Sequence, residues 1–253
     1  FAENVQGDMP FGVLLEIALQ PCGWLAAYIG SALTSDVDIS FRNLGGKATQ
    51  FFPIYPDAGT LAIHVHITQA SNSGGMIIQH YDYEVHSQQG LAYKGNTYFG
   101  FFSKQALSNQ VGIREAILYT PTPAELGRAK SFGYPQGGLF PEARMRMIDS
   151  IETFLLDGGP HGLGFIRGTK NVDPDDWFFK AHFFQDPVCP GSLGLESFLQ
   201  LLKVVMAERF NIGASGRIET IASGHPHEWT YRGQILPSDK LVTVEAVITE
   251  VDS

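Results

Sequence analysis

The residues best suited to proton-transfer chemistry lie in the stretch "HFFQDPVCPGSLGLESFLQLL", which runs from His182 to Leu202. His182 precedes a Pro190-Gly191 pair, and Glu196 lies in the apolar segment that this pair opens. A neutral imidazole near its usual pKa of about 6.5 accepts a proton at cellular pH. A carboxyl group on an apolar helix is desolvated, which raises its pKa and favours the proton-donating form. The stretch therefore predicts a base and an acid near the start of one helix.

Gly191 supplies a third group to the same stretch. It opens the predicted helix, so its backbone N–H lies at the positive end of the helix dipole. Pro190 before it fixes the direction of the chain into the helix. Such an N–H is suited to hold an oxygen that gains negative charge, and the missing side chain allows close approach. We therefore assign Gly191 as an oxyanion donor.

The helix that carries these groups has a second copy in the chain. "PFGVLLEIALQ" (10–20) and "PGSLGLESFLQ" (190–200) share a proline, a glutamate and a glutamine at an offset of 180 residues. "IYPDAGTLAIHVHIT" (54–68) and "ILPSDKLVTVEAVIT" (235–249) match at an offset of 181 residues. Two matches in the same order at one spacing indicate a duplicated fold. Glu16 and Gln20 thus correspond to Glu196 and Gln200.

Each copy is expected to contain one long helix followed by antiparallel strands. The helices are predicted over Val13–Ile29 and Leu193–Phe210, and both are apolar nearly all round, as helices buried by a sheet are. Alternating runs predict the strands: "TLAIHVHIT", "GMIIQHYDYEVHS" and "NTYFGFFS" in the first copy, then "RIETIA", "HEWTYRGQI" and "KLVTVEAVITEV" in the second. Helices segregated from strands make an α+β fold, a sheet wrapped around a central helix.

The boundary between the copies falls in a segment rich in Pro and Gly, residues 120–147, which is typical of a connector. We place the two units at residues 1–135 and 136–253. The first copy begins almost at its helix, and the second stops soon after its matched strand. The sequence therefore predicts a piece of a longer protein, trimmed at both ends.

The composition narrows the class of protein. The chain of 253 residues is 44% hydrophobic and 17% charged, which is typical of a globular protein, and its formal net charge of −9 argues against a nucleic-acid partner. Cys22 and Cys189 make no disulfide framework, which favours a cytoplasmic location. No apolar run reaches the roughly 20 residues of a transmembrane helix and no signal peptide precedes the fold, so neither membrane association nor secretion is expected.

Three segments resemble the hot-dog-fold 3-hydroxyacyl-[acyl-carrier-protein] dehydratases, most closely the bacterial 3-hydroxydecanoyl dehydratase/isomerase type. They are "RMRMID" (144–149), "NVDPDDWFFKAHFFQDPVCPGSLGLESFLQ" (171–200) and "YRGQILPSDKLVTVEAVIT" (231–249). The His-x7-Pro-Gly-x4-acid core is specific to that family. The first copy, with "MPFGVLLEIALQPCGWLAAYIGSAL", is similar to the dehydratase regions of polyunsaturated fatty acid synthases, which carry such hot dogs in tandem. The resemblance implies a double hot dog, two units side by side with their sheets joined.

The resemblance also implies an activity, the loss of water from a 3-hydroxyacyl thioester to give the 2-enoyl thioester. The substrate is expected on the phosphopantetheine arm of acyl carrier protein, and neither a metal nor a redox cofactor is required. The expected partners are acyl carrier protein and the other domains of a multidomain synthase, and a homodimer is compatible with this interpretation.

Within the family, the histidine of one hot dog works with the acid on the helix of the other. The resemblance therefore pairs His182 with Glu16, which Gln20 would orient from one helical turn away. Glu196, supported by Gln200, is the alternative acid. The mirror-related site is expected to be inactive, because Ala2 stands 180 residues before His182 and cannot act as a base.

Two further expectations concern the reach of the acid and the path of the acyl chain. Both copies carry glutamate where the family more often has aspartate, so the side chain is one methylene longer. Phe183, Cys189 and Pro190 are candidates for the wall of the substrate tunnel, although a small buried hydrophobe is the favoured interpretation of Cys189. The phenylalanines near His182 wall a tunnel or fill the core: Phe178, Phe179, Phe183 and Phe184.

Other motifs have plainer explanations. His64 and His66 share one face of a strand but lack a third metal ligand. "HPHE" (225–228) fits a turn that leads into a strand, and "GGPHGLG" (158–164) lacks the lysine of a phosphate loop and is typical of a hairpin turn. Glu16 or Glu196 could be a structural acid that caps a buried backbone group, and His182 a satisfied polar residue near a turn.

Three other functions stay open. A dehydratase that also isomerises its product to the 3-enoyl form would use the same base and oxyanion donor. A catalytically inactive hot dog could bind acyl chains or serve as a scaffold. A hot-dog thioesterase would hydrolyse the thioester, but the His-Pro-Gly core argues against it.

Overall fold

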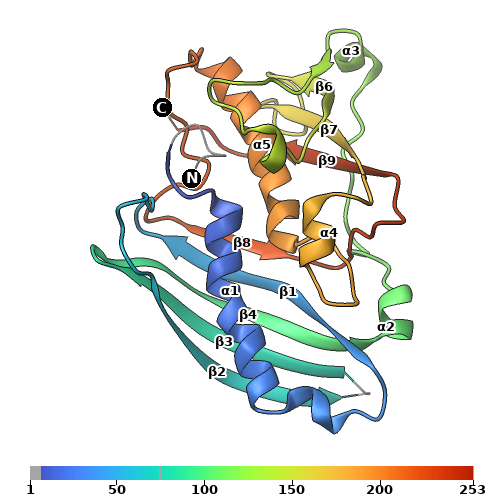
Figure 1. Cartoon of the computed structure of the whole chain (residues 1–253). Helices are drawn as coiled ribbons and strands as arrows, with labels where there is room; N and C mark the ends of the chain where they lie inside the picture. Colours follow the sequence, from blue (N-terminus) through green and yellow to red (C-terminus); the bar gives the residue numbers. More distant parts are fainter. Residues whose placement is uncertain (1–6, 74–75, 253) are drawn as a thin grey trace. The chain divides into compact units, whose positions relative to one another are not determined.

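The computed structural model describes residues 7–73 and 76–252, and its contacts divide them into two compact units (Figure 1). We call Asp8–Arg114 with Ile221–Gln234 the α1 unit, and Glu115–Thr220 with residues 235–252 the α5 unit, after the long helix of each. Each unit combines one long helix with an antiparallel sheet, so the predicted α+β class is confirmed. The units differ from the predicted division at 1–135 and 136–253 in residues 115–135 and 221–234.

The α1 unit contains a five-stranded antiparallel sheet in the order β2-β3-β4-β1-β8. Strands β2, β3 and β4 form a meander, and β1 pairs with β4 on one side and with β8 on the other (Figure 1). The elements of this unit are α1 (Phe11–Tyr28), the 3-10 helix η1 (Ser31–Thr34), β1 (Ile39–Gln50), β2 (Ala62–Ser73), β3 (Met76–Ser87), β4 (Gly90–Ser103), α2 (Lys104–Ser108) and β8 (Pro226–Thr230).

Strand β8 comes from the second half of the sequence but lies in the sheet of the first half. Its residues pair with Gly45–Thr49 of β1, from Gly45 opposite Thr230 to Thr49 opposite Pro226. A Cβ on Gly46 would lie 2.5 Å from the ring of Trp229, so glycine at this position makes room for the strand. The run "HEWTYRGQI" was predicted to be a strand, and it is one in part, but the local pattern does not identify its partner.

Helix α1 packs across the sheet of its own unit. Its Cys22 and Ala26 form a core cluster with Ile77, Tyr81, Phe99 and Phe101, which lie on alternate positions of β3 and β4. The alternation in "GMIIQHYDYEVHS" thus predicted β3 and its buried face correctly. Packing of this kind also explains why the helix continues through Pro21, which lacks the N–H that would bond one turn back.

By length and composition alone, α1 is apolar enough to cross a membrane. The same test is passed by a helix that is buried in a protein core or by a signal sequence. Leu14, Leu15, Ala18 and Cys22 are buried in the α1 unit. These four residues pack as in a core helix, whereas Trp24 and Tyr28 in the last turns of α1 are exposed.

The α5 unit has a four-stranded antiparallel sheet in the order β5-β6-β7-β9. Its core cluster joins Leu201, Val204 and Val205 of the helix to Ile166 and Val244 of the sheet. The elements of this unit are α3 (Pro123–Leu126), β5 (Lys130–Gly133), the 3-10 helix η2 (Ala143–Met145), β6 (Ser150–Leu155), β7 (Phe165–Asn171), α4 (Trp177–Ala181), α5 (Gly191–Arg209) and β9 (Leu241–Val247).

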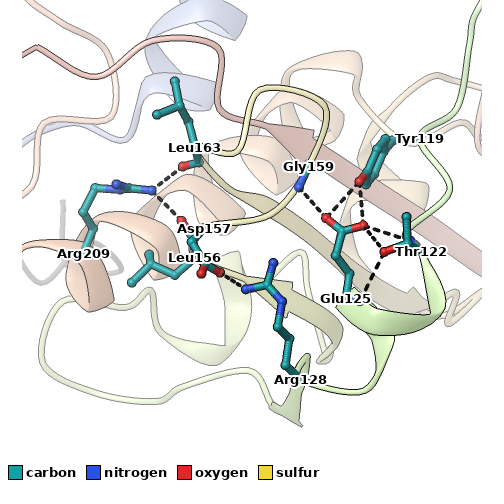
Figure 2. Close-up of polar contacts among 9 residues, drawn as sticks. All are labelled: Tyr119, Thr122, Glu125, Arg128, Leu156, Asp157, Gly159, Leu163 and Arg209. Carbon is teal, nitrogen blue, oxygen red and sulfur yellow. Dashed lines mark hydrogen bonds and ion pairs between the residues drawn. The ribbon is translucent and has the colours of Figure 1, made fainter.

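The loop between β6 and β7 is tied to the rest of the α5 unit at several points (Figure 2). Glu125, at the start of α3, accepts hydrogen bonds from Tyr119, from Thr122 and from the Gly159 N–H at 3.1 Å. These donors stabilise the ionised carboxylate and lower its pKa to about 2. Arg209, the last residue of α5, donates to the carbonyl oxygen of Leu156 at 2.6 Å. "GGPHGLG" therefore lies in a hairpin connection, as predicted.

The strands of the second half were predicted less well than those of the first. "KLVTVEAVITEV" contains β9, which ends at Val247. "RIETIA" (217–222) has no strand structure, although Ile218 is buried. An alternating pattern predicts which face of a segment is buried, but it does not provide a strand that pairs with it. Ile218 is therefore buried without hydrogen bonds to a neighbouring strand.

Candidate active site

His182 ends the short helix α4 and is half-buried in the α5 unit. Its Nδ1 lies 3.0 Å from the carbonyl oxygen of Val188. A carbonyl oxygen only accepts, so Nδ1 carries the hydrogen in this contact, and the neutral ring keeps its lone pair on Nε2. The Val188 N–H in turn donates to the His182 carbonyl oxygen at 2.9 Å. The loop thus fixes the ring with Nε2 as the basic atom.

The residues after Val188 lead directly into helix α5. Pro190 is the N-cap residue, with no side-chain cap, and Gly191 is the first residue of the helix, as predicted. The first intrahelical donors are the N–H groups of Leu193 and Gly194, at 3.0 and 3.2 Å from the Pro190 carbonyl oxygen. The N–H of Gly191 precedes both, at the end of the helix where the backbone dipoles favour negative charge. The α5 unit therefore brings an imidazole and a helix N-terminus into one continuous segment.

Glu196 and Gln200 form a braced pair one turn further along α5. Gln200 donates from Nε2 to a Glu196 carboxylate oxygen at 3.1 Å and to the Met145 carbonyl oxygen at 2.8 Å. Its Oε1 accepts from the Met147 N–H at 2.8 Å. Gln200 is fully buried and Glu196 is 6% exposed. Gln200 therefore ties the helix to the segment that leads into β6.

Glu16 and Gln20 form the corresponding pair in the α1 unit. Gln20 donates from Nε2 to Glu16 Oε1 at 2.7 Å, which is the hydrogen bond predicted from their spacing of one turn. Glu16 is half-buried and Gln20 is exposed. The two pairs thus share one hydrogen bond but differ in burial. The pairing of Glu16 with His182 stays a prediction, and Ala2, the residue that was compared with His182, lies outside the described residues.

Cys189 lines a pocket in the α5 unit, of about 350 Å³ including space open to solvent. Phe183 and Pro190, the other two residues assigned to a substrate tunnel, are not part of its lining. Burial raises the pKa of the Cys189 thiol to about 12, which argues against a nucleophilic role. The lining residues are Met147, Lys170, Asn171, Val172, Asp176, Phe178, Cys189, Leu193, Gly194, Ser197, Ile235 and Val242.

The phenylalanines near His182 have unlike environments. Phe178 and Phe179 are each 5% exposed, and Phe178 lines the pocket, which agrees with both predicted roles. Phe184 is 89% exposed, so in this structure it neither fills the core nor walls a tunnel. Phe184 lies in the loop after α4. A loop has no alternating or helical pattern from which the burial of a side chain could be predicted.

His227 lies in "HPHE" (225–228), which was predicted to be a turn before a strand, but Pro226, His227 and Glu228 already belong to β8. It lies on β8 in the α1 unit, and its ring centroid is 5.0 Å from that of Phe11, the first residue of α1. Its Nε2 is 3.0 Å from the Tyr93 hydroxyl, while Nδ1 is buried without a hydrogen-bond partner. Burial lowers the pKa of His227 to about 4. "HPHE" thus supplies a neutral histidine near the start of α1, which only the pairing of β8 with β1 reveals.

The part of the chain that the structure describes contains no cluster of side chains suited to bind a metal ion. Across residues 7–73 and 76–252, no group of three or more His, Cys, Asp or Glu side chains is placed to hold an ion. His64 lies on β2, where its ring faces that of His86 on β3, with the centroids 5.4 Å apart.

The sequence is similar to one protein family and to one type of synthase. Residues 140–253 match the family described as FabA-like domain. Over 98% of its length the chain is 31% identical to a subunit of the polyunsaturated fatty acid synthase of Thraustochytrium sp.. The chain spans 18% of the length of that relative. The resemblance to dehydratases and polyunsaturated fatty acid synthases drawn from the sequence is thus confirmed.

Solved structures give weaker likenesses. A candidate thioesterase from Novosphingobium aromaticivorans is 14% identical, with 97% of this chain and 78% of that chain covered and a TM-score of 0.43. A MaoC-like dehydratase from Phytophthora capsici is 12% identical, with 81% and 60% covered and a TM-score of 0.37.

Proposed function

We propose that the chain, whose residues 140–253 match the family described as FabA-like domain, dehydrates 3-hydroxyacyl thioesters carried by acyl carrier protein. The product is the 2-enoyl thioester, formed within a multidomain fatty acid synthase in the cytoplasm. We further propose that the α1 and α5 units are the two halves of a double hot dog. The likeness to one segment of a polyunsaturated fatty acid synthase supports both proposals.

The observation that carries the proposal is the position of the His182 ring. Its Nδ1 is held by the Val188 carbonyl oxygen, and the same loop ends at the N-terminus of α5. The removal of a proton next to a thioester carbonyl requires a base and an oxyanion donor, and this short segment carries both.

The reaction then proceeds with defined roles for each group. His182 Nε2 takes the proton from C2 while the Gly191 N–H holds the thioester oxygen as negative charge develops on it. A carboxylic acid gives its proton to the 3-hydroxyl group, the C3–O bond breaks, and water leaves. The double bond forms between C2 and C3, and the proton on His182 returns to the carboxylate through solvent.

We assign the acid to Glu16, with Gln20 as its positioning residue. The hydrogen bond of 2.7 Å between them supports this choice, because it holds the carboxyl group while leaving it half-buried. Glu196 is the alternative acid, but its partner Gln200 is committed to the backbone at Met145 and Met147. A carboxyl group in such a brace serves the packing of α5.

The test uses purified protein and a 3-hydroxyacyl thioester of N-acetylcysteamine, with products followed by mass spectrometry and chromatography. We expect the 2-enoyl thioester from the unsubstituted protein and a rate of its formation about 10²–10⁴-fold lower in His182→Ala. Release of free thiol without loss of water would show that the protein hydrolyses the thioester and does not dehydrate it. Formation of the 3-enoyl thioester would show that the protein also isomerises its product. Equal turnover by His182→Ala would overturn the proposal.

A further inference from the structure

Asp176 is a carboxylate in a pocket whose other walls are mostly apolar. It lines the pocket beside Cys189, together with Phe178, Leu193 and Val242. Its Oδ2 is buried and has no hydrogen-bond partner. A buried carboxylate oxygen without a donor costs free energy, so such an atom needs an explanation in terms of a ligand, an ordered water or a structural role.

The usual structural role of an aspartate at this position is not fulfilled. Asp176 is the N-cap residue of α4, where an aspartate side chain ordinarily accepts a hydrogen bond from a backbone N–H of the first turn. No such bond forms here. The carboxylate is therefore not used to cap the helix on which it stands.

An ion pair does not account for the carboxylate either. Lys170 also lines the pocket, but its ammonium group pairs with Asp149 at 3.2 Å. Burial is the largest influence on Asp176 and raises its pKa, and the nearby Asp173 and Asp149 add to this, while Lys170 opposes it. The surroundings thus favour a neutral hydrogen-bonding partner for Oδ2.

The pocket lies next to the proposed site of chemistry. Leu193 and Gly194 of its wall belong to the first turn of α5, two and three residues after Gly191. Cys189 of its wall follows Val188, which holds the His182 ring. A chain bound through its thioester at Gly191 therefore has this pocket beside it.

We propose that the pocket binds a hydroxyl-bearing part of an acyl chain and that Asp176 accepts the hydrogen bond of that hydroxyl. This makes Asp176 a specificity-determining residue that favours hydroxylated chains over unsubstituted hydrocarbon. The identification of the ligand as an acyl chain rests on the proposed function. The hydroxyl is either the one on C3, which the reaction removes, or one further along the chain.

The test measures binding in the absence of turnover, in a His182→Ala background. The probes are the N-acetylcysteamine thioesters of decanoic, 3-hydroxydecanoic and ω-hydroxydecanoic acid, and dissociation constants come from calorimetry. With Asp176 present we expect one hydroxylated probe to bind about tenfold tighter than the decanoyl probe, as one hydrogen bond to a charged group provides. The probe that gains identifies the source of the hydroxyl.

The matched variants are Asp176→Leu, which removes the acceptor, and Asp176→Asn, which keeps an acceptor oxygen at the same size. We expect the preference to vanish in Asp176→Leu and to survive in reduced form in Asp176→Asn. Thermal unfolding of Asp176→Leu controls for folding, and removal of a desolvated carboxylate should not lower its stability. An unchanged preference in Asp176→Leu, or no preference or no binding with Asp176 present, would overturn the inference.

A separate dehydration assay with His182 intact distinguishes this inference from the proposed function. If 3-hydroxyacyl thioesters are dehydrated but Asp176→Leu leaves the binding ratio unchanged, the inference alone fails. If the binding ratio depends on Asp176 but no water is lost, the proposed reaction fails and the ligand assignment stands.

Discussion

Helices α1 and α5 begin in the same way and carry the same glutamate–glutamine pair, yet their surroundings differ. Their N-cap prolines have nearly equal backbone angles, φ −55° and ψ 138° at Pro10 against φ −53° and ψ 131° at Pro190. Gln200 makes two hydrogen bonds to the backbone besides the one to Glu196, whereas Gln20 lies exposed and bonds Glu16. The two copies thus share the internal geometry of the helix, but only in α5 does the glutamine also tie the helix to a neighbouring segment.

The histidines near the starts of α5 and α1, His182 and His227, also differ in their surroundings. The His182 ring is held through Nδ1 by the Val188 carbonyl oxygen, which leaves Nε2 as the basic atom. The His227 ring packs against Phe11 and Tyr93, and burial keeps it neutral. One helix start therefore has the features of a proton-transfer site and the other those of a packed core.

The largest effect is expected from removing the base. His182→Ala should lower the rate of water loss by about 10²–10⁴-fold, the range that a positioned general base supplies. The matched control is His161→Ala, at an exposed histidine in the loop between β6 and β7 of the same unit, which should leave the rate unchanged. Rates are measured by single-turnover mass spectrometry with the 3-hydroxyacyl thioester. A loss of less than about tenfold in His182→Ala would show that His182 is not the general base.

The two glutamines should differ sharply in their contribution to stability. Gln200→Ala leaves the Met147 N–H and the Met145 carbonyl oxygen without their partner in a buried site, which costs about 3 kcal/mol in the free energy of unfolding. Gln20→Ala removes an exposed side chain and should cost less than about 0.5 kcal/mol. Urea denaturation followed by circular dichroism measures both. Equal costs would contradict the distinction between a brace and an open pair.

His227 should add a pH dependence to the stability of the α1 unit. Its pKa is 6.5 when unperturbed and about 4 in the folded protein, so the unfolded chain binds more protons between these values. The stability that comes from the neutral ring is therefore complete above pH 6.5 and is lost as the pH falls toward 4.

Replacing this histidine by glutamine tests that sign. The difference in unfolding free energy between the unsubstituted protein and His227→Gln should shrink, on the order of 1 kcal/mol, as the pH falls through this window. Urea denaturation at several pH values supplies the curve. A difference that stays constant, or grows on acidification, would show that the ring is not kept neutral by burial.

The sequence predicted those features that depend on local pattern. The expected helices, Val13–Ile29 and Leu193–Phe210, correspond to Phe11–Tyr28 and Gly191–Arg209, because a proline marks each start and apolar residues follow. The Glu16–Gln20 hydrogen bond followed from a spacing of one helical turn.

Features that depend on distant parts of the chain could not be predicted in this way. The pairing of β8 with β1 and the bonds from Gln200 to Met145 and Met147 join residues far apart in sequence. Asp176 was overlooked because an aspartate before a short helix ordinarily indicates a cap, and only the structure shows that the cap is absent.

We propose Glu16 as the working acid and Glu196 as a structural one. The most direct measurement is the single-turnover rate of water loss for Glu16→Gln and Glu196→Gln, each beside its unfolding free energy. We predict a loss of about 100-fold or more in Glu16→Gln with unchanged stability, and a rate near that of the unsubstituted protein in Glu196→Gln. Full activity in Glu16→Gln together with loss of activity in a stably folded Glu196→Gln would contradict the assignment.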